Sequence, residues 1–304
     1  MRNTIKKLYY SSPNSIYVAS ELKCQYEYLR LKRIVHQNSI ERHRIADADS
    51  LRRLNHDSTH KICHIIGSGT SVVKSYKSID SHNDFVIGFN YAGLLPLYFD
   101  IYFIEAASDG EQLLTLSLIH EQLFFHMCQR REPKIFVKCM WESNWWSSSF
   151  IQSRYEGKLG VIIDVIPNLP MLANSQALNL ANQKLFRKKR SRFFLNGTSS
   201  AIFSVLFAYQ LGFRNIVVHG VDYVGPHFFH SNEFTRDNDL INQIRELCPQ
   251  VPDDFVHGAG KWMSLEWPHV IRALAKSGVT VYAGSQSSLF STYAPVYIPY
   301  FHKS

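Results

Sequence analysis

The chain has no stretch that could cross a membrane and no cysteine pattern of a disulfide-bonded secreted protein. No segment approaches the ~20 consecutive apolar residues of a membrane-spanning helix. The basic residues at its start are not followed by the apolar region of a signal peptide. The five cysteines are scattered, without the paired spacing of a zinc site or a disulfide framework. We therefore expect a cytoplasmic protein in a reducing compartment, soluble or peripheral at the inner face of the membrane.

The sequence has fewer acidic than basic side chains. The sequence has 33 Lys and Arg against 25 Asp and Glu, a formal net charge of +8, which attracts anionic partners. The basic residues concentrate in the first 60 residues and in the run from Lys184 to Arg192. Aromatic residues are not interleaved with that run, so we expect no nucleic-acid partner. A peripheral contact with an anionic membrane fits the charge, although a solvated helix face is the alternative for any single residue.

Residues 1–60 differ from the remainder of the chain. From Ser15 to Val35 apolar residues recur at helical spacing, and a polar, helical pattern continues from Ser39 to Leu54. We interpret 1–60 as a helical N-terminal extension that packs on the main domain, 61–304, or on a partner. A homo-oligomer is consistent with such an arm, because helical arms often pack across a subunit boundary.

From residue 61 onward, short apolar runs alternate with helical patterns. The predicted strands are Ile62–Ile66, Phe85–Phe89, Ile101–Ile104, Lys134–Lys138, Val161–Val165, Asn215–His219 and Val279–Ala283. The predicted helices are Ser71–Lys77, Glu111–Gln129, Met171–Phe186, Ser199–Leu211, Leu240–Leu247 and Leu265–Ser277. Continuous apolar strands are typical of a parallel sheet covered on both faces. We therefore predict an α/β fold with a Rossmann-like, mostly parallel sheet, and lid or acceptor loops around 141–157 and 224–262.

Small and polar residues stand where several of these strands end. The first strand runs into Gly67-Ser-Gly69, a turn that lets a ligand approach the backbone and precedes a helix whose amides attract phosphate. The turn has two of the three glycines of a dinucleotide fingerprint, so by itself it does not distinguish a nucleotide site from a purely geometric turn. Asn90 and Asp222 follow later strands, and Ser200 begins a helix. Because ligands bind beyond the carboxyl ends of parallel strands, we expect these residues to line one crevice.

The order of these motifs resembles that of bacterial sialyltransferases of glycosyltransferase family 42. The motifs are Ile65-Ile-Gly-Ser-Gly-Thr-Ser71, Asn83-Asp-Phe-Val-Ile-Gly-Phe-Asn90, Thr198-Ser-Ser200, Leu211-Gly-Phe-Arg-Asn-Ile216 and Gly220-Val-Asp222, with Val279-Thr-Val-Tyr282 and Ser287-Ser-Leu289 near the end. Residues 80–90 are also similar to the first sialyl motif of the animal-type enzymes. The resemblance covers residues 61–295 and leaves the N-terminal extension unexplained.

The resemblance implies a glycosyltransferase with an A-type variant of the Rossmann-like fold, which needs no metal and no cofactor beyond its co-substrate, a CMP-activated acidic sugar. It would transfer that sugar to a hydroxyl of a surface glycan or glycolipid, as in lipopolysaccharide or capsule biosynthesis. The positions that would bind the donor are Gly67, Ser68, Gly69, Asn90, Glu105, Thr198, Ser199, Ser200, Gly220 and Asp222. Glu105 stands where the family has a sugar-binding asparagine, which leaves the donor open among sialic acid, Kdo and other nonulosonates.

The resemblance also implies a histidine as general base, which would take the proton of the acceptor hydroxyl. His257 occupies the region where the family has this histidine, and His227 and His230 are rivals in a motif similar to one of the animal-type enzymes. Val224 replaces one of the family's phosphate-binding tyrosines, which leaves Tyr223 beside it, His227, or a basic residue such as Lys261 to stabilise the leaving group. A single displacement with one base would invert the anomeric centre.

Two acid-x-acid pairs, Asp47-Ala-Asp49 and Asp237-Asn-Asp239, match the short motif of metal-dependent glycosyltransferases. A CMP-sugar has one phosphate and needs less charge neutralisation than a diphosphate sugar, so we expect no metal. Two other functions stay open. One is a metal-dependent enzyme for nucleotide diphosphates, similar to a pterin pyrophosphokinase or a motility-associated glycosylation protein, and the other is a non-catalytic nucleotide-binding scaffold.

Overall fold

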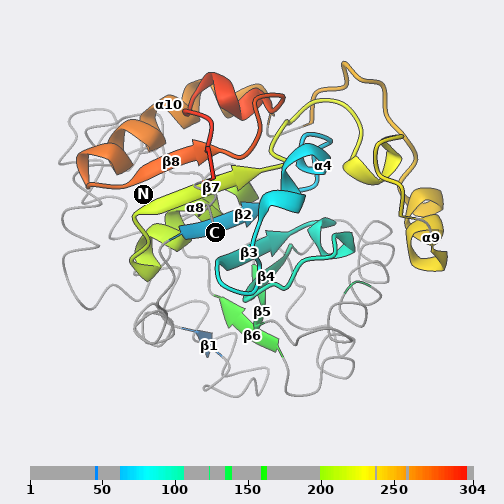
Figure 1. Ribbon diagram of the computed structural model, residues 1–304, viewed down its shortest axis with the longest axis horizontal. Coiled ribbons are helices and arrows are strands. Elements are labelled where there is room, and N and C mark those ends of the chain that lie inside the picture. Colours follow the sequence, from blue (N-terminus) through cyan, green and yellow to red (C-terminus); the bar gives the residue numbers. More distant parts are fainter. Residues whose placement is uncertain are drawn as a thin grey trace, which may run out of the picture.

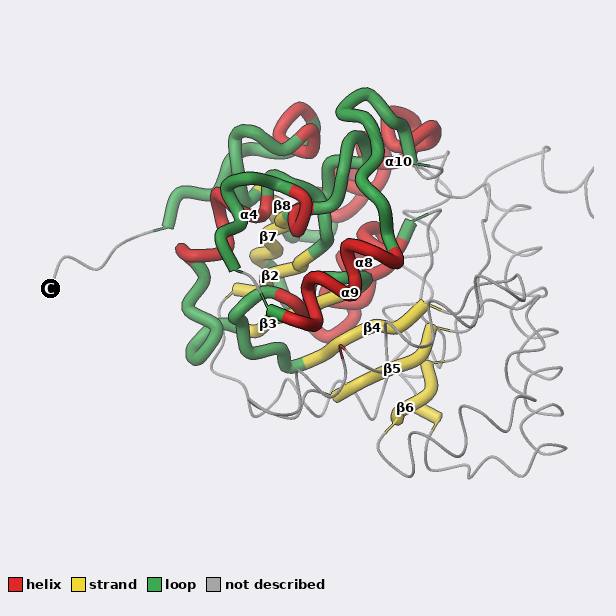
Figure 2. Tube along the Cα trace, turned by 90° about the vertical axis from the view of Figure 1, so that its right-hand side faces the viewer, coloured by secondary structure: helices red, strands yellow, loops and turns green. Residues whose placement is uncertain are grey.

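The computed structural model describes residues 62–105, 199–236, 238–257 and 260–299, together with residues 45–46, 123, 134–138 and 159–162. Within them, eight strands form one sheet in the order β1-β6-β5-β4-β3-β2-β7-β8, and every neighbouring pair is parallel. The strands are β1 (Ile45–Ala46), β2 (Ile62–Ile66), β3 (Phe85–Phe89), β4 (Ile101–Glu105), β5 (Lys134–Lys138), β6 (Leu159–Ile162), β7 (Asn215–His219) and β8 (Thr280–Ala283). Figure 2 shows them in this order from β8 to β6. The parallel sheet with its helices confirms the predicted α/β fold.

The apolar runs that predicted strands are strands in the structure. β2, β3, β5 and β7 have the predicted bounds, whereas β6 begins at Leu159, two residues before the predicted start. In the stretch 39–54, for which we expected a helix, Ile45 and Ala46 instead form a short strand that pairs with Val161 and Ile162 of β6. Pairing with a sheet edge overrides the local helical pattern at these two residues. The rest of 1–60 lies outside the described residues.

The described α-helices are α4 (Val72–Ser75), α8 (Ser200–Leu211), α9 (Asp239–Leu247) and α10 (Gly260–Lys276). The first predicted helix is shorter than expected, because α4 passes into a 3-10 turn over Tyr76–Ser78. The predicted helices 111–129 and 171–186 lie outside the described residues, Leu123 excepted. No helix in the described part of the chain is long and apolar enough to cross a bilayer.

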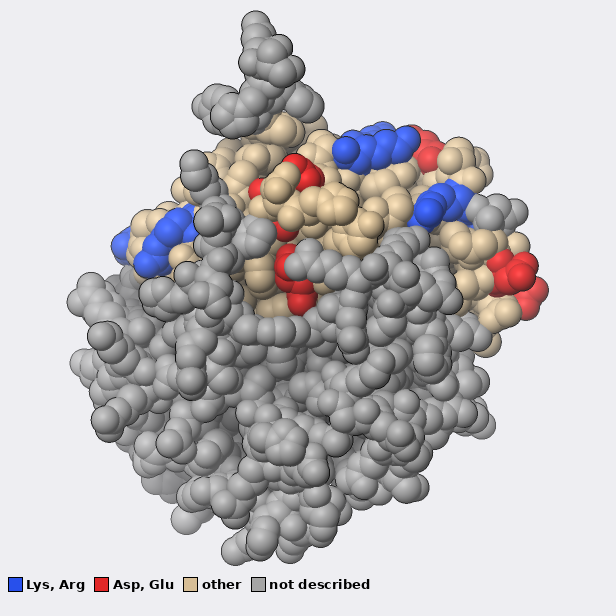
Figure 3. Space-filling model, turned by 60° about the horizontal axis from the view of Figure 1, so that its bottom comes forward, with Lys and Arg blue, Asp and Glu red and all other residues tan. Residues whose placement is uncertain are grey.

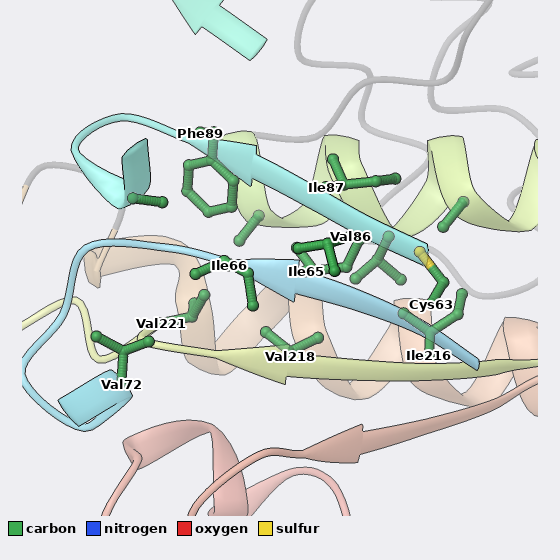
Figure 4. Packing of buried hydrophobic residues seen from close by; sticks show 14 of the residues in the cluster. Cys63, Ile65, Ile66, Val72, Val86, Ile87, Phe89, Ile216, Val218 and Val221 are labelled. Carbon is green, nitrogen blue, oxygen red and sulfur yellow. The ribbon is translucent and has the colours of Figure 1, made fainter. Parts of the chain in front are cut away.

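Helix α8 is the centre of the core. It contacts β2, β7 and α10, and its side chains are buried on nearly every side, as in a helix enclosed between a sheet and another helix. Phe103 of β4 packs edge to face against Phe203 and Phe207 of α8, with ring centroids 5.1 and 4.9 Å apart. Figure 4 shows the adjoining apolar side chains of β2, β3 and β7, among them Ile65 and Val218. The packing of α8 and these apolar side chains holds the carboxyl ends of β2 and β7 close to α4 (Figure 1).

Candidate functional site

The strand order changes direction at β2. From β2 the chain continues to β3 on one side, and β7 later pairs with the other side of β2. In open parallel sheets, a ligand crevice forms at such a switch point, beyond the carboxyl ends of the two strands. Gly67 follows β2 and Gly220 follows β7, so the structure brings these two predicted turns together at this point.

Two backbone hydrogen bonds join the turns. The amide of Gly67 donates to the carbonyl of His219 at 2.8 Å, and the amide of Gly69 donates to the carbonyl of Gly220 at 2.8 Å. A Cβ on Gly67 would lie 2.5 Å from the Gly220 oxygen, and one on Gly69 would lie 2.5 Å from the Asp222 carboxylate. The glycines that predicted a nucleotide site are therefore also required by the packing of one turn on the other, independent of any ligand.

Asp222 accepts hydrogen bonds from the segment that follows the glycine turn. Its buried carboxylate accepts two hydrogen bonds from Ser71, from the amide at 2.9 Å and from the hydroxyl at 2.7 Å. The next amide, that of Val72, donates to the Gly69 carbonyl at 3.2 Å. Both amides at the start of α4 thus bind acceptors of the protein itself, and the Asp222 carboxylate supplies the negative charge that this end of a helix favours.

The start of α8 lies beside the loop that follows β7. Ser199 caps this twelve-residue helix through its hydroxyl, which is also 2.6 Å from the hydroxyl of Tyr223. Trp267 of α10 donates from Nε1 to the same tyrosine hydroxyl at 3.3 Å. With a φ of 59°, Tyr223 has a left-handed backbone that aromatic residues rarely adopt, a conformation that persists only where surrounding contacts impose it. Ser200 is buried in the first turn of α8, and Thr198 lies outside the described residues.

His227 lies next to the glycine turn. Its Nδ1 is 3.1 Å from the hydroxyl of Ser68, and its ring contacts Tyr91 and Phe229 with centroids 4.8 and 5.4 Å away. Burial, and then the neighbouring His257, lower the pKa of His227 to about 4. At neutral pH this imidazole is therefore uncharged and is a weaker base than a free histidine.

His257 lies in a segment that pairs with the loop after β7. Its amide donates to the carbonyl of Tyr223 at 2.9 Å, and its Nε2 donates to the carbonyl of Gly225 at 2.9 Å. Because the proton of the neutral ring is on Nε2, Nδ1 is the nitrogen that can accept another proton. The ring centroid of His257 is 5.4 Å from that of His227, so these two predicted bases share one site.

Asn90 joins the site through its neighbour in the chain. It directly follows β3 and has a φ of 54°, a left-handed backbone that asparagine tolerates better than most residues. Its carbonyl accepts a hydrogen bond from the Tyr102 hydroxyl, which in turn accepts from the amide of Gly93. The following residue, Tyr91, provides the ring contact with His227.

Other predicted residues lie farther along the same elements. Glu105 ends β4, which β3 separates from β2. His230 packs against Phe229, with ring centroids 4.7 Å apart, and donates from Nε2 to the carbonyl of Cys248 at 2.7 Å. Asp47, Asp49, Asp237 and the loop 141–157 lie outside the described residues. Among the residues that are described, no three His, Cys, Asp or Glu side chains gather as a metal site would require.

Two residues of the candidate site were not predicted from the sequence. Trp267 is 44 positions from Tyr223 in the chain, and its contact with the tyrosine exists only because α10 packs on α8. Ser71 is part of a recognised motif, but its bonds to Asp222 cross 151 positions of sequence. No local signal could have found either partner.

Charges of both signs occur on the described surface in Figure 3. The basic runs that suggested an anionic partner, in the first 60 residues and at 184–192, lie outside the described residues.

No family model and no curated protein matches the chain. Among solved structures, the alpha-2,3-sialyltransferase from Campylobacter jejuni in apo form is similar, with 16% identity and a TM-score of 0.43 over 79% of this chain and 80% of that one. The Campylobacter jejuni sialyltransferase CstII in complex with the substrate analogue CMP-3FNeuAc has 14% identity and a TM-score of 0.42 over 78% and 86%. The sialyltransferase CST-II in complex with trisaccharide acceptor and CMP has 15% identity and a TM-score of 0.41 over the same shares. The chain is therefore similar in structure to sialyltransferases at low sequence identity.

Proposed function

We propose that this protein is a glycosyltransferase that moves an acidic sugar, sialic acid, Kdo or a related nonulosonate, from a CMP-activated donor to a hydroxyl of a glycan or glycolipid. One observation carries the proposal. Tyr223 is bonded through its main chain to His257 and through its hydroxyl to Ser199, at the start of α8. Tyr223 thus connects His257, which can accept a proton, to the N-terminus of α8, which can bind a phosphate.

The chemistry follows from these positions. The N-terminus of α8 attracts the phosphate of the donor, and the hydroxyl of Tyr223 donates to the departing phosphate oxygen. Nδ1 of His257 takes the proton of the acceptor hydroxyl as its oxygen attacks the anomeric carbon. The bond from that carbon to the phosphate oxygen breaks, and its electron pair leaves with CMP. We propose that no metal takes part, because the donor has a single phosphate, and that the single displacement inverts the anomeric centre.

The acceptor would approach His257 from the side of Phe255. This ring is 45% exposed and its centroid is 5.2 Å from that of His257. The carbonyl of Phe255 accepts the Gly225 amide at 2.9 Å, which fixes the main chain that carries this ring. Rigid aromatic surfaces beside a few polar groups are typical of small-molecule sites.

Replacing this ring tests the acceptor side alone. We expect Phe255→Ala to raise the KM for a glycan acceptor by about tenfold, the cost of roughly 1.4 kcal/mol of lost contact, while the Kd for CMP stays the same. Leu247→Ala is the control, since Leu247 is a similarly exposed apolar side chain, on α9. An unchanged acceptor KM in Phe255→Ala would remove Phe255 from the acceptor site.

Thermal unfolding with nucleotides tests the donor class. A ligand that binds the folded state raises Tm by mass action, so CMP is expected to raise it with and without EDTA, and CDP, UDP and GDP are not. Incubation with CMP-sialic acid, CMP-Kdo and a lactoside acceptor, followed by mass spectrometry, then identifies the transferred sugar. A shift that requires a diphosphate nucleotide and a metal would instead indicate a metal-dependent enzyme, and CMP binding without transfer would indicate a scaffold.

A further inference from the structure

A chain of polar side chains crosses the sheet behind the glycine turn. It begins at Asp84, immediately before β3, whose Oδ2 is 3.2 Å from Nε2 of His64 on β2. Nδ1 of His64 is 2.9 Å from Nε2 of His219 on β7. Nδ1 of His219 is in turn 2.9 Å from the hydroxyl of Ser75, the last residue of α4. This hydrogen-bonded chain of side chains, the proton chain, thus runs from the amino edge of the sheet to the helix that follows the glycine turn.

Only the first member of this chain has access to solvent. Both histidines are 1% exposed and Ser75 is 3% exposed, whereas the side chain of Asp84 is 25% exposed. A Cβ on Gly284 would overlap the ring of His219, so the space for this ring depends on a glycine. Buried imidazoles are costly unless their nitrogens are hydrogen-bonded, and here all four nitrogens have partners.

His219 holds the glycine turn at both of its ends. Its carbonyl accepts the amide of Gly67, where the turn begins, at 2.8 Å. Its ring bonds to Ser75, where α4 ends. The segment 67–75, which includes the predicted donor residues Gly67, Ser68 and Gly69, is therefore anchored to one histidine.

The Asp84 carboxylate determines the direction of every hydrogen bond in the chain. A carboxylate only accepts, so His64 donates to it from Nε2 and must accept at Nδ1. His219 then donates to His64 from Nε2 and accepts the hydroxyl proton of Ser75 at Nδ1. In this state both imidazoles are neutral.

One added proton reverses this direction. His64 becomes an imidazolium beside Asp84 and donates from Nδ1 to Nε2 of His219, whose own proton is then on Nδ1 and is donated to Ser75. The hydroxyl proton of Ser75 turns to the carbonyl of Val72, 3.4 Å away, which already accepts the amide of Tyr76 at the end of α4. A second proton would place an N–H group on both Nδ1 of His64 and Nε2 of His219, which face each other, so the proton chain accepts only one added proton.

We propose that Asp84, His64 and His219 are positioning residues for the donor turn, acting through Ser75, and that one proton on this chain weakens the turn's hold on its ligand. The identity of that ligand rests on the proposed function. In the neutral chain the Ser75 hydroxyl donates to Nδ1 of His219 at 2.9 Å, and its longer contact of 3.4 Å with the Val72 carbonyl leaves that carbonyl to the Tyr76 amide. In the protonated chain the Ser75 hydroxyl competes with the Tyr76 amide for Val72, which loosens the end of α4.

The surroundings favour His64 as the site of the proton. Around the pair, the described residues contribute the titratable groups Asp84, Asp100, Cys63, Tyr282 and Tyr297. Burial, and then nearby acidic groups, raise the pKa values of Cys63 and Tyr297, so both stay neutral as the pH falls. Burial, and then His64, lower the pKa of His219 well below its usual value, so His219 is the ring that stays neutral. The Asp84 carboxylate lies 3.2 Å from Nε2 of His64, where it would stabilise a positive charge on that ring.

Nitrogen NMR of protein labelled with 15N-histidine tests the proton chain without any ligand. Above neutral pH we expect both rings to carry their proton on Nε2. On acidification His64 should become doubly protonated while His219 changes to the Nδ1-protonated form, in one shared transition. A His219 ring that keeps its Nε2 proton while His64 titrates, or that becomes charged itself, would overturn the chain.

Calorimetric titration with CMP tests the positioning role. We expect Ser75→Ala to weaken CMP binding by about fivefold at pH 8, the value of one hydrogen bond, and to abolish the further weakening that the native protein shows through the shared transition. Ser204→Ala is the control, because it removes a buried hydroxyl whose hydrogen bond among the described residues, to the carbonyl of Ser200, lies within α8. The phosphate of CMP titrates in the same pH range, so the difference between the proteins is compared.

The outcomes separate the two proposals. If Ser75→Ala and Ser204→Ala both bind CMP as the native protein does at every pH, the positioning role is wrong. If the native protein does not bind CMP at all, the proposed function fails and the donor-positioning role with it, while the NMR result still decides whether the chain holds one shared proton.

Discussion

The two imidazoles of the site differ in what their nitrogens contact. His227 is held between Ser68 and aromatic rings, and its lowered pKa makes it a poor proton acceptor. His257 is fixed by a bond from Nε2 to a main-chain carbonyl, which leaves Nδ1 for a substrate. The difference assigns them separate roles, with His257 as the proposed base and His227 as a ligand-contacting group.

Single substitutions distinguish these roles. We expect His257→Ala to lower the rate of sugar transfer by about 10²- to 10⁴-fold, the usual contribution of a general base, with little change in the Kd for CMP. His227→Ala should instead raise the Kd for CMP, because the ring lies against Ser68 in the glycine turn. His82→Ala, an exposed histidine, is the control in both assays. Full transfer activity in His257→Ala would refute its assignment as the base.

Buried histidines also make the fold sensitive to acid. Burial, as the larger cause, lowers the pKa of His227 to about 4 and that of His219 well below its usual value. Below pH about 6.5 the unfolded chain binds protons at these positions and the folded chain does not, so the free energy of unfolding falls as the pH falls toward 4. For His227 the loss is on the order of 2 kcal/mol, with allowance for its partial exposure.

Urea unfolding between pH 7.5 and 4.5 measures this loss. His227→Gln, which has no titrating ring, should be less sensitive to pH than the native protein over this range, and His82→Gln should have the native sensitivity. Equal slopes for all three proteins would contradict the depressed pKa of His227.

At the level of the elements, the glycine turn is held by the protein and not by a ligand. It is bonded to the loop after β7 through Gly67 and Gly69, and Asp222 binds Ser71 at the start of α4. The ends of β2 and β7 are thereby joined to each other, so the turn has its shape without a ligand. Preformed sites of this kind lose little conformational entropy on binding.

Glycine substitutions separate packing from backbone strain. Gly69→Ala would bring a Cβ to 2.5 Å from Asp222, whereas Gly278→Ala has open space around it and only an unfavourable φ of 73°. We expect Gly278→Ala to cost about 1 kcal/mol of unfolding free energy. Gly69→Ala should cost about 2 to 3 kcal/mol and should also weaken CMP binding. Equal costs, with CMP binding unchanged, would show that the turn relaxes without affecting the site.

At the scale of the whole molecule, the candidate site lies at the ends of the strands that we expect to resist local opening most strongly. β2 and β7 lie side by side in its interior, each paired on both edges, and both contact the buried helix α8. Local opening of such strands approaches global unfolding in cost, whereas edge strands open more easily.

Amide hydrogen exchange measures this distribution. We expect the amides of β2 and β7 to be the slowest to exchange among the described strands, and those of β8, at the edge, to exchange faster. Faster exchange in β2 than in β8 would show that the switch point is not part of the most stable unit.

The amino-acid sequence by itself determined most of the elements in the described part of the chain. β2, β3, β5 and β7 were predicted to the residue, because continuous apolar runs bounded by turn residues have few other solutions in a parallel α/β fold. Gly67, Asn90, Ser200 and Asp222 were expected at one crevice, since residues after parallel strands share one edge of the sheet.

Only the tertiary structure decided which of these residues contact one another. The strand order puts β7 beside β2, and the register pairs Ile66 with His219 and His64 with Val217. That register places His64 and His219, 155 positions apart in sequence, on the same face and within hydrogen-bonding distance. Local pattern cannot predict such contacts, because they depend on long-range pairing and not on the propensity of any segment.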